Sequence, residues 1–354
     1  MSFLLQIFVP FALPFPISPQ ELHEAFDKSY SEILDLEIEI DVAGTGYIAM
    51  KQVAHEEWPL AVNEVSPWVP KEAGSGRRYK LIEFRLEDDS TEELIKEKFK
   101  LVHGEDSSEH AYGLYIAYAL SELKNRVAEI ILAANIARPG SIQTGEDVGF
   151  LNGKMYYHNL SVHSSEGRIT DVLWLTYEDA HKFGWPLISH MSVKLVWDWL
   201  NKFEGLKSGI ISGKVGRALA ALSCIIESRN NDADLEIVMW SLVGVEAIFS
   251  KGNSQIQQQV IENTQLLLGP KQSYKQHLSK MYDFRSRFIH GEMDIPLAFN
   301  RDEFHDEDRF GKKHLTPFQS ATIALSILLA TLQKLVLNSW TSIEFIHTSE
   351  IQGQ

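Results

Sequence analysis

The pattern of apolar and polar residues differs between the two halves of the chain. In residues 34–42 (LDLEIEIDV) and 79–87 (YKLIEFRLE), apolar and charged residues alternate, which predicts strands with one buried face. Residues 110–137 keep a helical spacing of apolar residues until Pro139 and Gly140, which predicts one long helix. The short runs KMYYHNLSVHS and DVLWLTY favour extended structure. This half is expected to form an α+β domain, residues 1–187.

From about Ile188 onward, one helical pattern follows another. Six segments keep apolar residues at i, i+3, i+4 and i+7, namely ISHMSVKLVWDWLNKF, KVGRALAALSCIIES, DLEIVMWSLVGVEAIFS, SQIQQQVIENTQLLL, KQSYKQHLSKMYDFRSRFIH and TPFQSATIALSILLATLQKLVLNSW. Polar connections such as SRNNDAD and LGPKQS are short, as antiparallel neighbours require. Residues 188–354 are therefore expected to form an all-α antiparallel helical bundle.

Apolar residues are also dense at the N-terminus, MSFLLQIFVPFALPFPISPQ. This stretch has no basic residue, and Pro10, Pro14 and Pro16 interrupt any helix, so two or three short extended segments are expected. The apolar helix around residues 318–340 carries several polar side chains and is expected in the core, so no membrane span is predicted. The single cysteine, Cys224, is expected as a buried, inert thiol, and this usage fits a cytoplasmic protein.

The charge of the chain is unevenly spread. The net charge is −15, which argues against a general nucleic-acid binder. From Gly209 onward there are 14 Lys and Arg against 16 Asp and Glu, so residues 1–208 carry −13 of the total. Residues 271–290 hold five Lys and Arg against one acid, a local +4. The most basic segment of an acidic protein therefore lies in the helical half.

Common motifs for bound groups are absent from the sequence. It contains no GxxxxGK[ST], HExxH or GxSxG. The run HGEDSSEH, residues 103–110, offers two imidazoles and three carboxylates, but it precedes a helix and is rich in capping residues, so a capping loop is favoured over a metal site. His305 and His314, in a charged loop, receive the same interpretation. We therefore expect neither a metal nor another cofactor.

Two polar features of the helical half indicate a site. Glu246 lies in the apolar run VMWSLVGVEAIF and must find a partner or be protonated; Arg285 and Tyr282 are candidates. Tyr282 and Arg285 share one helix face, whereas His290 lies five residues beyond Arg285, about 140° round an ideal helix. Gly291 is expected to end the helix and free His290 from the helical direction.

An imidazole beside permanent cations suits the cleavage of RNA. Imidazole can take the proton of a ribose 2′-OH or give one to the leaving 5′-oxygen, while a guanidinium holds the phosphate oxygens. Because the substrate supplies the nucleophile, this chemistry needs no metal. A basic last helical turn without function remains the alternative on local grounds, and a packing role for Glu246 is as compatible with the sequence as a supporting role at a site.

The stretch YDFRSRFIHG resembles the R-x4-6-H motif of the HEPN superfamily, and more closely the Y-x-x-R-S-x-x-x-H-G form of ApeA-like HEPN domains. The preceding GRALAALSCIIES, MWSLVGVEAIFS and LLLG are similar to that domain as well, so the resemblance spans residues 188–345. It implies a metal-independent endoribonuclease with catalytic Arg285 and His290, acting on tRNA or other cellular RNA as a toxin or in abortive antiphage defence. Ser286 stands where active nucleases often carry Asn, Asp or His.

The resemblance also implies a homodimer in which two motif helices line one cleft, so that one chain's Arg285 need not meet its own His290. Tyr282 and Glu246 would orient Arg285, Ser286 would support the motif, and Arg287 and Lys280 would attract the RNA backbone. The acidic residues 1–187 would be a sensor or regulator with an unknown ligand or protein trigger. The alternative is a catalytically inactive HEPN module for dimerisation or for binding a ligand or nucleotide.

Overall fold

The computed structural model describes residues 3–13, 19–41, 45–59, 79–88, 93, 95–97, 111–144, 147–158, 172–206, 210–227, 234–252, 255–270, 274–292 and 317–345. The chain divides into two compact units, Met1–Asp171 with Met191–Trp197, and Val172–His190 with Asp198–Gln354. The units therefore interleave close to the boundary expected after residue 187. The run HGEDSSEH and residues His305 and His314 lie outside the described residues.

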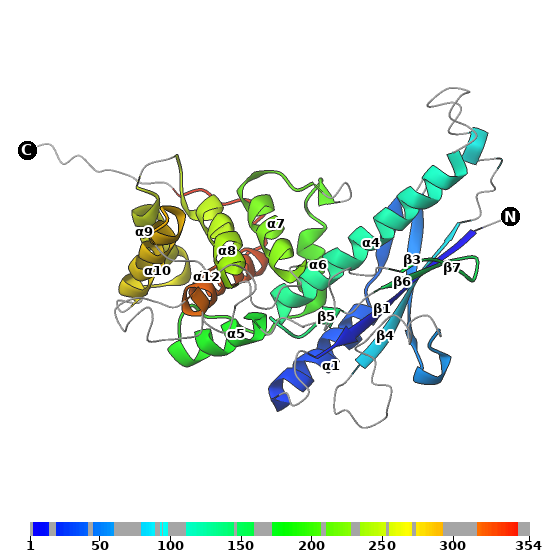
Figure 1. Cartoon of the computed structure of the whole chain (residues 1–354), viewed down its shortest axis with the longest axis horizontal. Helices are drawn as coiled ribbons and strands as arrows, with labels where there is room; N and C mark the ends of the chain where they lie inside the picture. The colour runs from blue at the N-terminus through cyan, green and yellow to red at the C-terminus, as the bar shows by residue number, and fades with distance from the viewer. Residues whose placement is uncertain are drawn as a thin grey trace, which may run out of the picture. The chain divides into compact units, whose positions relative to one another are not determined.

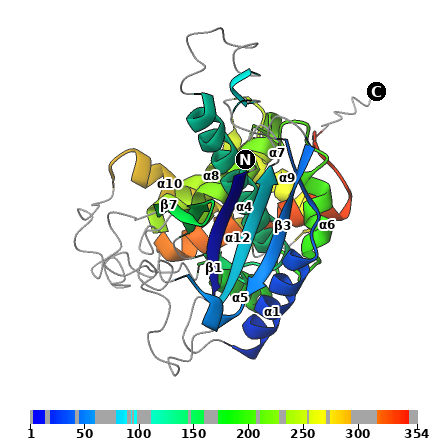
Figure 2. The same cartoon turned by 90° about the vertical axis from the view of Figure 1, so that its right-hand side faces the viewer.

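The first unit contains an antiparallel sheet with the strand order β2-β3-β4-β1-β6-β7, and β5 also pairs with β1 (Figures 1 and 2). Its strands are β1 (Phe3–Ala12), β2 (Ile38–Asp41), β3 (Thr45–Val53), β4 (Tyr79–Asp88), β5 (Gln143–Thr144), β6 (Val148–Leu151) and β7 (Lys154–His158). The alternating pattern of residues 79–87 thus predicted β4 correctly. The pattern of residues 34–42 corresponds only to the short β2.

The apolar N-terminus forms one strand of ten residues instead of two or three short segments. Pro10 is tolerated because of its place in the register. β1 pairs with β6 through Leu5–Phe8 and with β5 through Phe11–Ala12, so Pro10 falls between these two pairings. The backbone of Leu4 bonds Asn152 on the β6 side, and with a period of two the nitrogen of Pro10 points to that side as well. The missing N–H therefore removes no ladder hydrogen bond.

Two helices pack on each other and on the sheet, α1 (Gln20–Leu34) and α4 (Ala111–Ala137). The ring of Tyr30 on α1 packs edge-on against Phe11 of β1 at a centroid distance of 6.4 Å. The opposite face of the sheet carries a smaller apolar cluster around Phe8 and Leu81, to which Trp58 contributes from beyond the 3-10 turn η1 (His55–Glu57). The predicted α+β architecture and the long helix are thus confirmed, whereas α1 was not predicted.

The regular elements described in the second unit are all helices. Its helices are α5 (Val172–Phe183), the end of α6 (Val193–Leu200), α7 (Gly213–Glu227), α8 (Asp234–Phe249), α9 (Ile256–Leu268), α10 (Tyr274–Ile289) and α12 (Pro317–Leu337). All six segments expected from Ile188 onward contain a helix. The extended structure expected for DVLWLTY is wrong, because this run begins α5; an apolar run of six residues does not by itself distinguish a strand from a helix.

The core of this unit lies where α8 meets α7 and α12 (Figure 1). At Gly244 of α8, an added Cβ would lie 2.9 Å from a methyl group of Leu328 on α12, so the glycine permits this close approach. The stretch Phe318–Leu337 is long and apolar enough to cross a membrane, yet 89% of its apolar window is buried within the protein. It is the core helix that its polar residues predicted. Cys224, expected to be buried, is half-buried on α7.

Candidate functional site

The last turns of α10 carry most of the candidate site residues. One face of this helix packs on α9 and α12 and buries Leu278, Met281, Tyr282 and Phe284. Lys280, Ser286 and His290 are exposed, while Arg285 and Arg287 are half-buried. The apolar spacing therefore fixes which cations face the bundle and which face solvent.

The end of α10 is a Schellman motif. The N–H of Glu292 donates to the carbonyl oxygen of Arg287 at 2.8 Å, and that of Gly291 donates to Phe288 at 3.4 Å. Gly291 adopts φ 72°, a region that glycine enters without the cost of a Cβ. The N–H of His290 still bonds the carbonyl oxygen of Ser286 at 3.0 Å, as in a helix. The glycine therefore turns the chain only after His290, and the histidine keeps the helical direction, in contrast to the expectation.

Arg285 forms an ion pair with Glu246 of α8. It is one of the two partners that the sequence predicted for this carboxylate, which stands in an apolar run. Arg285 Nη2 donates to Glu246 Oε2 at 3.3 Å, and Nε lies 3.2 Å from Oε1 as an ion pair without hydrogen-bond alignment. Both distances exceed those usual for charge-assisted hydrogen bonds. The side chains are 31% and 17% exposed. The pair joins α10 to α8, but it holds the guanidinium loosely.

The surroundings of Glu246 make its carboxyl harder to ionise than that of a free glutamate. Burial raises the pKa of this carboxyl, and the Arg285 charge and the nearby Tyr282 hydroxyl offset the effect only in part. The pKa of Tyr282 is itself raised, first by burial and then by the Glu246 charge. Tyr282, Arg285 and Glu246 thus form one coupled group, and such perturbed carboxyls gather at functional sites.

His290 does not join this group. Its side chain is exposed and makes no hydrogen bond, ion pair or ring contact with any residue that the structure describes. The structure thus brings Glu246, Tyr282 and Arg285 together and leaves His290 on the solvent side with Ser286 and Lys280. Within one chain, the imidazole is open to a ligand from outside, while the guanidinium of Arg285 is engaged.

The chemistry available here is proton transfer and anion binding. An exposed imidazole can exchange protons with a ligand, and half-buried guanidinium groups can hold oxyanions by paired hydrogen bonds. Within the described parts of the chain, no three His, Cys, Asp or Glu side chains gather as metal ligands would. The basic side chains of α10 can therefore bind an anion such as a phosphate group.

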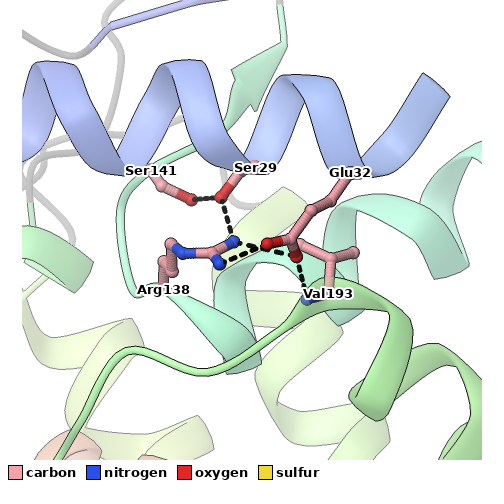
Figure 3. A network of polar contacts seen from close by, with 5 residues as sticks. All are labelled: Ser29, Glu32, Arg138, Ser141 and Val193. Atoms are coloured by element: carbon pink, nitrogen blue, oxygen red, sulfur yellow. Dashed lines mark hydrogen bonds and ion pairs between the residues drawn. The ribbon is translucent and has the colours of Figure 1, made fainter. Parts of the chain in front are cut away.

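A second buried polar network, which the sequence did not reveal, lies in the first unit (Figure 3). Arg138, 1% exposed, follows α4 and donates to both carboxylate oxygens of Glu32 on α1, at 2.7 and 3.3 Å. It also bonds Ser29, whose hydroxyl contacts Ser141 at 2.9 Å. Glu32 accepts a further hydrogen bond of 2.6 Å from the N–H of Val193, the first residue of α6. This network anchors the start of α6 to α1 and α4.

Another buried ion pair lies along α4. Arg126 donates to Glu129 at 2.6 Å, and Glu122 lies one turn earlier on the same face. All three residues are buried. Burial raises the pKa of Glu129 to about 7, because the attraction of Arg126 does not fully offset it. The i, i+4, i+7 spacing of these charges within a largely apolar helix is the sequence signal that could have identified them.

Comparison with known proteins leaves the site to be judged on its own geometry. No protein-family model, no curated protein and no solved structure matches this chain.

Proposed function

We propose that this protein is a metal-independent endoribonuclease of the HEPN type, with His290 as its general acid and base. The observation that carries the proposal is the placement of His290: an exposed imidazole, kept in helical register by a Schellman motif, on the most basic segment of an acidic chain. The substrate is tRNA or another cellular RNA, and the setting is a toxin or an abortive antiphage response.

The reaction follows from what the imidazole can exchange. The ribose 2′-oxygen attacks the adjacent phosphorus as a base removes its proton, and the bond from phosphorus to the 5′-oxygen breaks as an acid protonates that oxygen. The products are a 2′,3′-cyclic phosphate and a 5′-hydroxyl. A guanidinium stabilises the charge on the phosphate oxygens in the transition state. The resemblance assigns this role to Arg285, with Tyr282, Glu246 and Ser286 in support.

The assembly is a homodimer formed through the helical unit. One histidine per chain gives a two-chain cleft both an acid and a base, which supports this assembly. Arg287 and Lys280 attract the RNA backbone, and an unknown ligand or protein acts on the first unit as a trigger. The protein works in the cytoplasm, where such RNA is found.

The engagement of Arg285 by Glu246 favours a second candidate, a catalytically inactive HEPN module for dimerisation or for binding a ligand or nucleotide. In this candidate, the ion pair serves to pack α10 on α8. It requires neither the imidazole of His290 nor a free guanidinium.

The experiment that separates the two candidates compares purified wild type with His290→Ala and Arg285→Ala on total tRNA and on single-stranded RNA, with a chelator present. The nuclease predicts cleavage to 2′,3′-cyclic phosphate ends by wild type, its loss in His290→Ala and its weakening in Arg285→Ala. His181→Ala, which removes an exposed histidine of α5 in the same unit, is the matched control and should cleave normally.

The same variants are expressed in cells, where RNA integrity and growth are followed with and without phage infection. Intact RNA and equal growth for wild type and His290→Ala under both conditions, together with no cleavage in vitro, would refute the nuclease.

A further inference from the structure

The chain passes between the two units twice in a short stretch around the start of α6. Val172–His190 belong to the second unit, Met191–Trp197 to the first, and the chain from Asp198 onward to the second again. The second passage lies inside α6 (Val193–Leu200), which continues without a break. Met191–Trp197, the crossing segment, is therefore a short part of the first unit that is covalently tied to the second unit at both ends.

The crossing segment is fixed to the first unit at its start. The N–H of Met191 donates to the carbonyl oxygen of Ala137, the last residue of α4, at 3.0 Å. Two residues later, the N–H of Val193 donates to Glu32, which Arg138 holds in turn (Figure 3). The first N–H groups of a helix have no partner within it. Glu32 supplies one here and places a negative charge at the positive end of α6.

The residues on either side of the crossing segment are fixed within the second unit. Before it, the N–H of Ser189 donates to Gln333 Oε1 at 3.0 Å, and the carbonyl oxygen of Ser189 accepts from Gln333 Nε2 at 2.9 Å. After it, the indole N–H of Trp199 donates to the carbonyl oxygen of Trp340 at 2.8 Å. Gln333 lies on α12 and Trp340 just beyond its end. Both flanks are therefore attached to α12 or its continuation, and α12 is also a helix on which α10 packs.

We infer that the crossing segment couples the first unit to the helical unit, with the Arg138–Glu32 network as its control point. While Glu32 caps α6, the start of the helix stays ordered, and a trigger that draws Glu32 away removes the cap. A helix of eight residues is not stable by itself, so its start then frays. The change reaches α12 through the attachments of Ser189 and Trp199, and it reaches α10 through α12. The coupling extends the proposed function, on which it rests only for the activity that is regulated.

Val193→Pro removes the cap without touching the Arg138–Glu32 pair. Val193 is the first residue of α6, a position where proline fits because the N–H there has no partner within the helix. Hydrogen exchange measured by mass spectrometry on the full chain is expected to rise about fivefold in α6, the factor that the loss of one cap brings. The residues around Trp340 and the last turns of α10 should exchange about twofold faster.

The double variant Arg138→Met/Glu32→Met is the matched background for this test. It removes the cap together with both charges, so it leaves no unpaired buried charge. In this background Val193→Pro should add no further exchange in α6, because the hydrogen bond that it breaks is already gone. The same added factor in both backgrounds would show that the proline ring and not the lost cap is responsible, and would refute the inference.

The coupling must also act in the reverse direction. Gln333→Met, in the second unit, removes both hydrogen bonds to Ser189. It is expected to raise exchange about twofold at the end of α4 in the first unit, beside Ala137 and Arg138. Unchanged exchange there, or around Trp340 in Val193→Pro, would mean that the two units respond independently, and the inference would fail.

A failure of the proposed function is distinguishable from a failure of the coupling. The exchange measurements need no RNA, so a wild type that cleaves no RNA would refute the ribonuclease and leave their result intact. Where the wild type does cleave total tRNA, the rate of Val193→Pro should differ from it by at least about twofold. An equal rate beside a positive exchange result would refute the regulation of the site.

Discussion

Two arginine–glutamate pairs, one in each unit, differ in how completely the carboxylate is satisfied. Burial acts to raise the pKa of Glu32, but hydrogen bonds from Arg138 and the Val193 N–H outweigh it, so the pKa is lowered. Burial also acts on Glu246, and there Arg285 and Tyr282 do not compensate, so the pKa is raised. The Arg138–Glu32 pair thus satisfies its carboxylate and holds two helices together. In the Arg285–Glu246 pair, the carboxylate is only partly compensated.

The geometry of the pairs agrees with this distinction. Arg138 is 2% exposed at its side chain and reaches Glu32 at 2.7 Å, while Arg285 is 31% exposed and stays 3.2 Å from Glu246. A buried pair that satisfies its donors and acceptors is costly to break on one side only. A half-exposed pair is screened by water and contributes less. The stability of each unit should therefore depend very differently on its arginine.

The largest expected effect is that of Arg138→Ala. It removes the only cation that the described residues place against the Glu32 carboxylate, which keeps the Val193 N–H and the Ser192 hydroxyl. We expect the first unit to lose about 3–5 kcal/mol in its free energy of unfolding. Hydrogen exchange measured by mass spectrometry on the full chain reports this loss in peptides of α1 and α4 separately from the second unit. Arg85→Ala, which breaks an exposed pair with Glu87 in the same unit, is the control and should cost less than about 1 kcal/mol.

A loss of about 1 kcal/mol or less in Arg138→Ala would remove the distinction between the two pairs.

Arg285→Ala is expected to have a smaller effect, about 1 kcal/mol in peptides of α8 and α10, because the pair is half-exposed and Glu246 can take up a proton once the arginine is gone. The same exchange experiment measures it. Lys182→Ala, which breaks an exposed pair with Glu178 on α5, is the matched control. A destabilisation as large as that of Arg138→Ala would mean that the Arg285–Glu246 pair stabilises the fold as strongly as the Arg138–Glu32 pair.

The sequence predicted one of these pairs because the signal was local. Glu246 stands in a run of apolar residues, so its need for a partner was visible, and Arg285 was one of two candidates. The Arg138–Glu32 pair joins residues 106 positions apart. Arg138 lies in a turn before Pro139, and Glu32 lies on a helix that was not predicted. Neither residue's local sequence therefore indicated the contact. Pairing over such distances depends on the tertiary fold.

The same limit explains the direction of His290. Gly291 correctly predicted the end of α10, but the expectation that it frees His290 from the helical direction was wrong. The hydrogen bonds of Gly291 and Glu292 to Phe288 and Arg287 place the turn after it. Helix capping depends on which carbonyls the next two N–H groups reach, and residue types alone do not fix this choice.

The smallest expected effect is a difference in pH dependence between the two pairs. Glu32 has a lowered folded pKa, so its contribution to stability is present above its ordinary value of 4.5 and is lost as the pH falls through the folded pKa. Glu246 has a raised folded pKa, so its contribution is present below 4.5 and is lost as the pH rises through the folded pKa. The effects are small because both carboxyls are partly exposed and screened.

Hydrogen exchange between pH 3 and pH 7, corrected for intrinsic rates, tests these opposite slopes in peptides of α1 and of α8. The difference between wild type and Glu32→Gln isolates the first slope, and the difference between wild type and Glu246→Gln isolates the second. Each subtraction cancels other carboxyls such as Glu129, whose pKa of about 7 adds its own slope near α4. Slopes of the same sign would show that Glu246 is as well satisfied as Glu32, and Arg285 would then be as firmly committed to packing as Arg138.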